Sequence, residues 1–307
     1  MVVGDERRPR GESGWKLSGV PAGLSGMTEP IAGVAAGVPY TALPPPGGAA
    51  DAPLIVAWHL MDPPCTDAAM AAALPMREVP AWRVYLGLPM TGRRALPGGF
   101  DELMRLGYQD AVLNLFAPVS AQASAEAPAA VAEVRARLGI PDGPVGVLGG
   151  SLGSMVALEV AATGSLPVAA GAIVSSAVRL TSIIEANEVR FGTTYEWSER
   201  SRAAATRLDY VARAGEIAAR RDARGGPPPF LVLTGQEDAE PLQRAAEELA
   251  SELAAGYPDD TAVRLVNLPG VAHNLAEPPG EAPAPQTDSA RLVDAELTAW
   301  FRTHLKS

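Results

Sequence analysis

The 307-residue chain is long enough for one large domain or two small ones, and its 47% hydrophobic content suits a packed core. A net charge of −10 argues against binding to nucleic acid or to an anionic membrane surface. The single cysteine, Cys65, excludes an internal disulfide and a cysteine-rich metal site. No stretch approaches the ~20 apolar residues of a membrane span, and residues 1–20 lack the apolar segment of a signal peptide. We therefore expect an acidic cytoplasmic protein with a loose arm at residues 1–20.

Short apolar runs alternate with helical segments along the chain. Residues 27–34 and 38–43 are expected to form a hairpin. Further strands are expected at 54–58, 81–86, 144–148, 168–175, 230–234 and 262–268, and helices at 68–76, 126–138, 152–163, 241–255 and 289–304. Since apolar strands that alternate with helices favour a parallel sheet covered on both faces, we expect an α/β fold with a doubly wound, mostly parallel sheet.

One segment, 179–229, departs from this alternation. It contains nine arginines and seven acidic residues, and it closes with the run Gly-Gly-Pro-Pro-Pro. Its composition is typical of helices, and it falls between two expected strands. We interpret it as a helical cap inserted into a core that is formed by residues 21–178 and 230–307.

The sequence GGSLG at residues 149–153 fits the pattern G-x-S-x-G. It lies between the expected strand 144–148 and the expected helix 152–163, so Ser151 falls at a strand-to-helix turn. A sharp turn exposes the serine Oγ, and the glycines let the strand and the helix approach closely. The helix N-terminus directs free N–H groups towards any oxyanion formed there. We interpret Ser151 as a nucleophile, the alternative being a capping serine in a glycine-rich loop.

A serine nucleophile needs a base, which is itself oriented by a carboxylate, and in this setting the order is serine, acid, histidine. The chain has three histidines. His59 precedes the serine, and His304 lies on a polar stretch of the last expected helix. His273 follows the last expected strand, where a loop can lean over the sheet edge. We therefore interpret His273 as the base, the alternative being an ordinary loop histidine.

The acid is expected directly after the strand 230–234, in the sequence GQEDAEP. Asp238 lies at the tip of this strand, where its carboxylate can orient the imidazole of His273. The neighbouring Glu237 is a rival for the same role. Asp238 can alternatively act only as a helix cap before Pro241.

These three segments, in this order at strand ends, resemble the α/β-hydrolase family, and the resemblance covers most of residues 27–305. It implies a second oxyanion donor in the loop after the third strand, where the family often has a His-Gly pair. Here His59 matches but Leu60 replaces the glycine, which can narrow the pocket. The resemblance implies that the donors are the backbone N–H groups of Leu152 and of Leu60 or Met61.

Insertions at the position of the cap shape the acyl pocket in the resembling family. This one carries the aromatic residues Phe191, Tyr195 and Trp197. They can line the substrate pocket with His59, or they can pack the cap onto the core.

The resulting hypothesis is a serine hydrolase that cleaves a carboxylic ester of a small molecule through an acyl-enzyme, with no cofactor and no metal. A thioesterase, a lactonase, a peptidase or amidase and an acyltransferase would use the same triad. A binding protein that keeps the fold without catalysis is the alternative from another class. The sequence does not indicate an oligomeric state.

Overall fold

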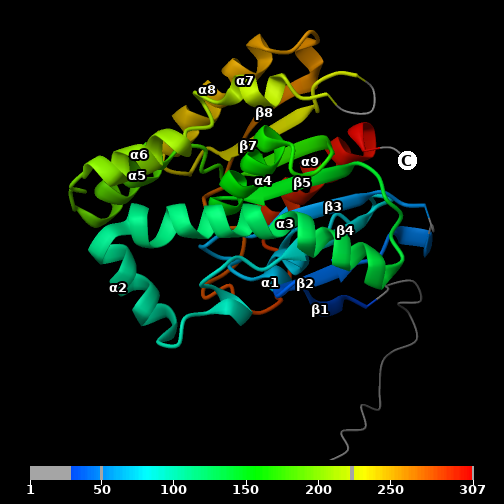
Figure 1. The fold of residues 1–307 in the computed structure, drawn as a ribbon, viewed down its shortest axis with the longest axis horizontal. Helices are drawn as coiled ribbons and strands as arrows, with labels where there is room; N and C mark the ends of the chain where they lie inside the picture. The colour runs from blue at the N-terminus through cyan, green and yellow to red at the C-terminus, as the bar shows by residue number, and fades with distance from the viewer. Residues whose placement is uncertain (1–28, 49–50, 222–224, 306–307) are drawn as a thin grey trace, which may run out of the picture.

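The computed structural model describes residues 29–48, 51–221 and 225–305, so the predicted arm at 1–20 lies outside the described residues. The described residues contain one sheet with the strand order β1-β2-β4-β3-β5-β6-β7-β8 (Figure 1). Strands β3 to β8 run parallel, and β1 and β2 join antiparallel at one edge. The strands are β1 (Ile31–Ala35), β2 (Val38–Leu43), β3 (Leu54–Trp58), β4 (Trp82–Leu86), β5 (Val145–Gly150), β6 (Val168–Val174), β7 (Phe230–Gly235) and β8 (Val263–Leu268).

Helices cover both faces of this sheet, which confirms the predicted doubly wound, mostly parallel α/β architecture. In Figure 1, α3 and α4 lie in front of the sheet and α9 lies behind it. The helices are α1 (Asp67–Ala73), α2 (Gly99–Ala111), α3 (Ala117–Leu138), α4 (Leu152–Thr163), α5 (Leu180–Phe191), α6 (Glu199–Arg207), α7 (Ala214–Ala218), α8 (Glu240–Ala255) and α9 (Asp288–His304). Among the described helices, none combines the length and apolarity that a membrane crossing requires.

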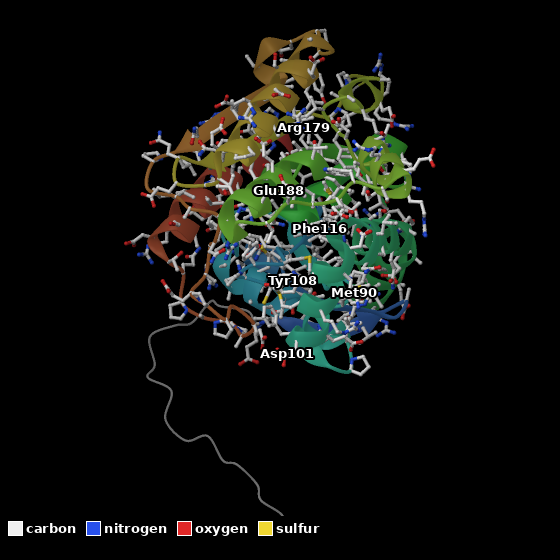
Figure 2. The ribbon with its side chains drawn as sticks, turned by 90° about the vertical axis from the view of Figure 1, so that its left-hand side faces the viewer. Met90, Asp101, Tyr108, Phe116, Arg179 and Glu188 are labelled. Atoms are coloured by element: carbon white, nitrogen blue, oxygen red, sulfur yellow. The ribbon has the colours of Figure 1, made fainter. Side chains whose placement is uncertain are left out.

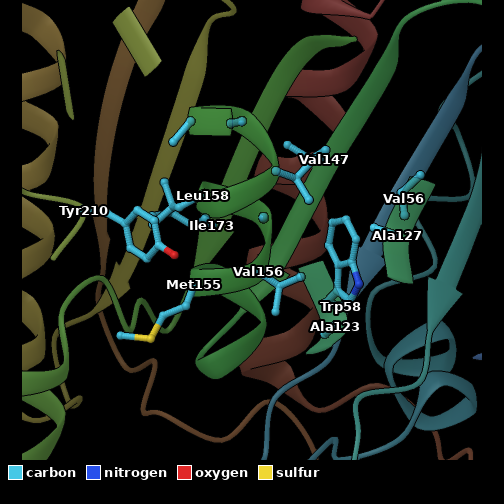
Figure 3. Close-up of a cluster of buried hydrophobic side chains, with 14 of the residues drawn as sticks. Val56, Trp58, Ala123, Ala127, Val147, Met155, Val156, Leu158, Ile173 and Tyr210 are labelled. Carbon is cyan, nitrogen blue, oxygen red and sulfur yellow. The ribbon is translucent and has the colours of Figure 1, made fainter. Parts of the chain in front are cut away.

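The central strands are buried on both faces because their side chains alternate between two hydrophobic clusters. Val56 and Trp58 of β3 pack with α3 and α4 in one cluster, shown in Figure 3. Ile55 and Ala57, which point the other way, pack with α1 and α9 in the second cluster. The continuous apolar runs of the sequence therefore correspond to strands enclosed between two helix layers.

The structure differs from the sequence-based expectation between β4 and β5. Helix α2 was not predicted, and α3 begins at Ala117 rather than at residue 126. None of the α2 residues is fully buried, and Asp110 near its end has a non-helical backbone. Its apolar residues Phe100, Leu103 and Met104 do follow helical spacing, so the helical pattern was present in the sequence and was not recognised.

Residues 179–221 form the helices α5, α6 and α7, which follow β6 and lie over the α4 and α8 side of the sheet. Ion pairs tie this segment to the core helices: Arg213 to Glu159 of α4 at 2.7 Å, and Glu185 to Arg244 of α8 at 2.9 Å. Figure 2 looks onto the side where α5, labelled at Glu188, and α2, labelled at Tyr108, both face the viewer, with Phe116 labelled between them. The segment is helical, as predicted, and it continues directly from the carboxyl end of β6.

Replacing Leu158 by alanine should destabilise the protein by about 2–5 kcal/mol, because this α4 side chain is completely buried between the sheet and the helices. Urea unfolding monitored by circular dichroism measures this loss. Leu292→Ala on α9 is the matched control, since that side chain is 46% exposed and should cost well below 1 kcal/mol. Equal losses in the two variants would contradict the assignment of the core.

Candidate active site

Ser151 occupies the turn between β5 and α4 in a backbone conformation that is rare for a residue with a side chain. Its φ is 46° and its ψ is −118°. The Ser151 N–H donates to the Val174 carbonyl at 2.9 Å, and the Ser154 N–H donates to the Ser151 carbonyl at 2.8 Å. These bonds hold the serine at the N-terminus of α4, where the first N–H groups of a helix lack partners within the helix. The turn therefore has the form of a nucleophile elbow.

The two outer glycines of the turn are required by close packing. A Cβ at Gly149 would overlap the carbonyl of Gly153, and a Cβ at Gly153 would overlap the carbonyls of Trp58 and His59. The obstructing atoms are backbone atoms, which cannot move aside easily. The start of α4 is therefore pressed against the carboxyl ends of β5 and β3.

His273 lies in the loop after β8 and contacts the serine directly. Its Nε2 is 3.0 Å from Ser151 Oγ, so the hydroxyl can donate to the imidazole. The Ser175 hydroxyl donates to the His273 carbonyl at 2.9 Å and fixes the backbone of this loop. The loop thus places His273 in contact with Ser151, the residue for which the sequence predicted it as a base.

Asp238 lies on the other side of the imidazole, in the turn after β7. His273 Nδ1 is 3.0 Å from both carboxylate oxygens, and the Asp238 side chain is only 3% exposed. The α8 cap residue is Ala239, so the Asp238 carboxylate does not cap that helix. Glu237 is exposed, and its N–H donates to the Val271 carbonyl at 3.0 Å. The structure thus brings together Asp238, His273 and Ser151, and leaves Glu237 facing solvent.

A second carboxylate, Asp62, lies beside the same imidazole. Its Oδ2 is 3.7 Å from His273 Nε2, and its Oδ1 is 3.7 Å from Arg190 Nη1 of α5. Burial lowers the pKa of His273, but the hydrogen bond and charge of Asp238 and the charge of Asp62 together outweigh burial and the opposing charge of Arg190. The pKa of His273 is therefore raised, because the carboxylates stabilise the imidazolium form.

Three backbone N–H groups have no hydrogen-bond acceptor within the described part of the chain: that of Leu152, directly after Ser151, and those of Leu60 and Met61 in the loop after β3. They are the groups that the family resemblance implied as oxyanion donors. The Leu60 side chain does not project outwards to narrow the site. It is completely buried and packs against Gly150.

His59 holds the loop after β3 in place and is not an open part of a pocket. Its side chain is 1% exposed, its Nδ1–H donates to the Leu60 carbonyl, and the Leu88 N–H donates to its Nε2 at 2.9 Å. Burial lowers the pKa of His59 to about 4, which keeps this neutral tautomer at physiological pH. The expectation that His59 lines the substrate pocket is therefore corrected: both ring nitrogens are occupied by backbone groups.

The loop after β3 is also fastened to the segment that follows His273. The Cys65 N–H donates to the Gly280 carbonyl at 2.9 Å, and the Leu275 N–H donates to the Pro63 carbonyl at 3.0 Å. The Thr66 hydroxyl adds a bond to the Glu281 carbonyl at 2.8 Å. Two loops far apart in the sequence therefore form one backbone-linked unit beside the serine.

The three aromatic residues of 179–229 have different surroundings. Tyr195 donates its hydroxyl to Asp110 at 2.6 Å and meets Trp197 edge to face, and both pack against the core cluster. Phe191 is 50% exposed, with the Arg190 guanidinium over its ring. The hydrogen bonds and ring contacts of these residues within the described chain do not involve Ser151 or His273. This arrangement favours a packing role for Tyr195 and Trp197.

No protein-family profile and no curated protein sequence matches the chain. Among solved structures, TT1662 from Thermus thermophilus superposes with a TM-score of 0.58 at 20% identity, over 89% of this chain and 97% of that one. Carboxyl esterase 2 from Tuber melanosporum gives 0.55 at 13% identity, over 95% and 90% of the two chains. The acylaminoacyl peptidase of Pyrococcus horikoshii gives 0.61 at 14% identity, over 92% of this chain and 42% of that one.

The chain has the α/β-hydrolase fold. The family resemblance of the sequence is thus confirmed for the architecture. At these identities the similarity establishes the fold alone, and the chemistry must be argued from the site itself.

Two residues of this α/β-hydrolase site were missed by sequence reasoning, namely Asp62 and Arg190. Asp62 belongs to the same loop as the implied oxyanion donors, and that position was the one available signal. Arg190 was one of nine arginines in its segment, and no spacing rule distinguishes it from the others. Within the described residues, no cluster of three or more His, Cys, Asp or Glu side chains is arranged to hold a metal.

Titration of the histidines by NMR should separate His273 from His59. We expect the midpoint of the His273 titration to lie above the ordinary pKa of about 6.5, and that of His59 to lie at about pH 4. Asp62→Asn should lower the His273 midpoint, because it removes a negative charge that favours the imidazolium. His273→Gln and His59→Gln assign the signals. A His273 midpoint below 6.5, or one that Asp62→Asn leaves unchanged, would contradict these electrostatics.

Proposed function

We propose that the protein is a serine hydrolase that cleaves carboxylic esters of small molecules through a covalent acyl-enzyme. The observation that carries this proposal is the continuous chain of contacts from Asp238 through His273 to Ser151, with each step at 3.0 Å. The position of the serine at a strained turn before α4 supports it, because such strain is typical of functional sites.

In this mechanism Ser151 Oγ attacks the substrate carbonyl carbon while His273 Nε2 takes the hydroxyl proton. Asp238 accepts the Nδ1–H of His273, which selects the tautomer whose Nε2 is free to act as a base. It also stabilises the imidazolium that forms. His273 then returns the proton to the leaving oxygen. Water, activated by the same imidazole, releases the acid and regenerates Ser151.

The negative charge that develops on the carbonyl oxygen needs fixed hydrogen-bond donors. The unpartnered N–H groups of Leu152 and of Leu60 or Met61 are suited to this role. They are backbone groups held by α4 and by the loop that His59 fixes. Little reorganisation is therefore needed when the oxyanion forms.

The helical segment 179–229 acts in this proposal as a cap on the core 21–178 and 230–307, and it bounds the acyl pocket. Phe191 is the best placed of the three aromatic residues to meet substrate, because Tyr195 and Trp197 are engaged in packing. A thioester, a lactone, an amide or peptide, or transfer of the acyl group to another acceptor, would use the same residues. Kinetics across acyl substrates on purified protein would rank these possibilities.

Ser151→Ala should abolish covalent labelling by a fluorophosphonate probe and lower ester hydrolysis on the order of 10³-fold or more, because it removes the attacking oxygen. Intact-protein mass spectrometry and initial rates measure the two effects. Ser251→Ala, which removes an exposed hydroxyl on α8, is the matched control and should behave like the wild type. Labelling of the folded Ser151→Ala variant would refute the proposal.

Two neighbouring acids provide a test of the triad. Asp238→Asn should lower kcat/KM about 10³- to 10⁴-fold, because an amide cannot orient the imidazole as the carboxylate does. Glu237→Gln should change kcat/KM by less than about twofold, since Glu237 faces solvent. Circular dichroism checks that both variants are folded. If Glu237→Gln has the larger effect, the acid is assigned wrongly.

A further inference from the structure

Asp62 is a carboxylate that the proposed mechanism does not use, although it lies beside the reacting atoms. Its Oδ2 is 3.7 Å from His273 Nε2, the nitrogen that also contacts Ser151 Oγ at 3.0 Å. Asp238, which orients the imidazole, lies against the opposite nitrogen, Nδ1. The imidazole is thus flanked by two carboxylates, and only Asp62 is on the side where bonds are made and broken.

The hydrogen-bonding capacity of the Asp62 carboxylate is unused within the described structure. Its contacts with His273 and Arg190, both at 3.7 Å, are ion-pair distances that are too long for hydrogen bonds. The Asp62 side chain is 35% exposed, so it is accessible to a bound molecule. A carboxylate with free acceptor positions at the edge of a site is suited to contact a ligand.

The position of Asp62 indicates which part of a substrate it meets. When the acyl-enzyme forms, the imidazolium Nε2–H gives its proton to the leaving atom, which must then lie within hydrogen-bond distance of Nε2. A carboxylate close to the same nitrogen therefore lies next to the leaving group. The acyl chain extends from the carbonyl carbon on the other side of the bond that breaks.

We propose that Asp62 is a specificity-determining residue that favours substrates whose leaving group carries a positive charge, such as esters of amino alcohols. This inference rests on the proposed function. The negative charge of Asp62 attracts a cationic group attached one or two carbons from the leaving atom, and it repels a leaving group that carries a carboxylate.

Arg190 opposes this preference without cancelling it. Its side chain is 64% exposed and its charge is therefore strongly screened by water, whereas Asp62 is less exposed and lies nearer to the buried triad. The effect of Asp62 on the pKa of His273 is also larger than the opposing effect of Arg190. A cationic leaving group thus meets a site in which the negative charge dominates.

A pair of phosphonate inhibitors with leaving groups of equal shape tests this preference. The first probe carries a thiocholine leaving group, and the second carries the neutral 3,3-dimethylbutanethiol, which has the same outline without the charge. In each reaction Ser151 Oγ forms a bond to phosphorus and the thiolate departs. The measurement is the ratio of the second-order inactivation rates, cationic over neutral, divided by the same ratio for the reaction of the two probes with hydroxide in water. This division removes the faster departure of thiocholine that its ammonium group causes with any nucleophile. A change in the protonation of His273 affects both probes equally, so it cancels in this ratio.

We expect the wild type to react about tenfold faster with the cationic probe, and Asp62→Asn to bring the ratio close to one. Arg190→Gln should raise the ratio a few-fold, because it removes the competing cation. Asp142→Asn is the matched control, since it removes a fully exposed carboxylate before β5, at the other end of that strand. Its ratio should equal that of the wild type. The Arg190→Gln result keeps the proposal testable if Asp62→Asn does not fold.

A ratio that is the same in the wild type and in Asp62→Asn would overturn the proposal, and so would Arg190→Gln lowering the ratio. If Asp62→Asn slows both probes equally, Asp62 acts only through His273 and the proposal is also wrong. Labelling of Ser151 by a fluorophosphonate distinguishes these failures from a failure of the proposed hydrolase activity. Without that labelling, both proposals fail together.

Discussion

The close approach of α4 to the ends of β3 and β5 is the constraint on which the whole site depends. It requires glycine at Gly149 and Gly153, where any side chain would overlap backbone carbonyls. The unusual backbone of Ser151 costs about 1–3 kcal/mol, and the surrounding packing must offset it. Because α4 is buried almost completely against the sheet, the serine cannot relax without disturbing the core.

The close contact of α4 with the ends of β3 and β5 also brings charged side chains and backbone N–H groups to the same edge of the sheet. The N-terminus of α4 lies against the end of β3 and the loop that follows it, since a Cβ at Gly153 would overlap the carbonyls of Trp58 and His59. His273 enters from a third element, between Asp238 and Asp62. Each carboxylate lies against a different nitrogen of the ring, and the two therefore affect different events. In the proposed mechanism Asp238 sets the tautomer of His273, and Asp62 sets the electrostatic field where the leaving group departs.

Much of the architecture could be predicted from the sequence because buried strands and amphipathic helices leave strong apolar patterns. The hairpin of β1 and β2 and the strands β3 to β8 all appear within a few residues of the expected positions. Helix α2 was missed although Phe100, Leu103 and Met104 follow helical spacing, and none of its residues is buried.

The site could be predicted only in part, for a related reason. Ser151, His273 and Asp238 follow strand ends in a recognisable order, and the structure places them in contact. Asp62 and Arg190 meet only through the tertiary fold, with nothing in their local sequence to pair them. The burial of His59 could not be predicted either, because its hydrogen-bond partners are the backbone groups of Leu60 and Leu88, which leave no side-chain signal in the sequence.

The hydrogen bonds that join the loop after β3 to the segment after His273 have a consequence for local unfolding. Cys65 and Leu275 each bond across to the other loop, and Thr66 adds a third link. Cooperative opening of a protein proceeds in contiguous hydrogen-bonded units rather than residue by residue. Release of either loop would therefore free the other, and the imidazole and the proposed oxyanion donors of the loop after β3 would leave the serine in a single event. If the proposed mechanism holds, a partly open form would therefore have no activity rather than reduced activity, because Ser151 would stay in place on α4 without the His273 imidazole and without the N–H groups of the loop after β3.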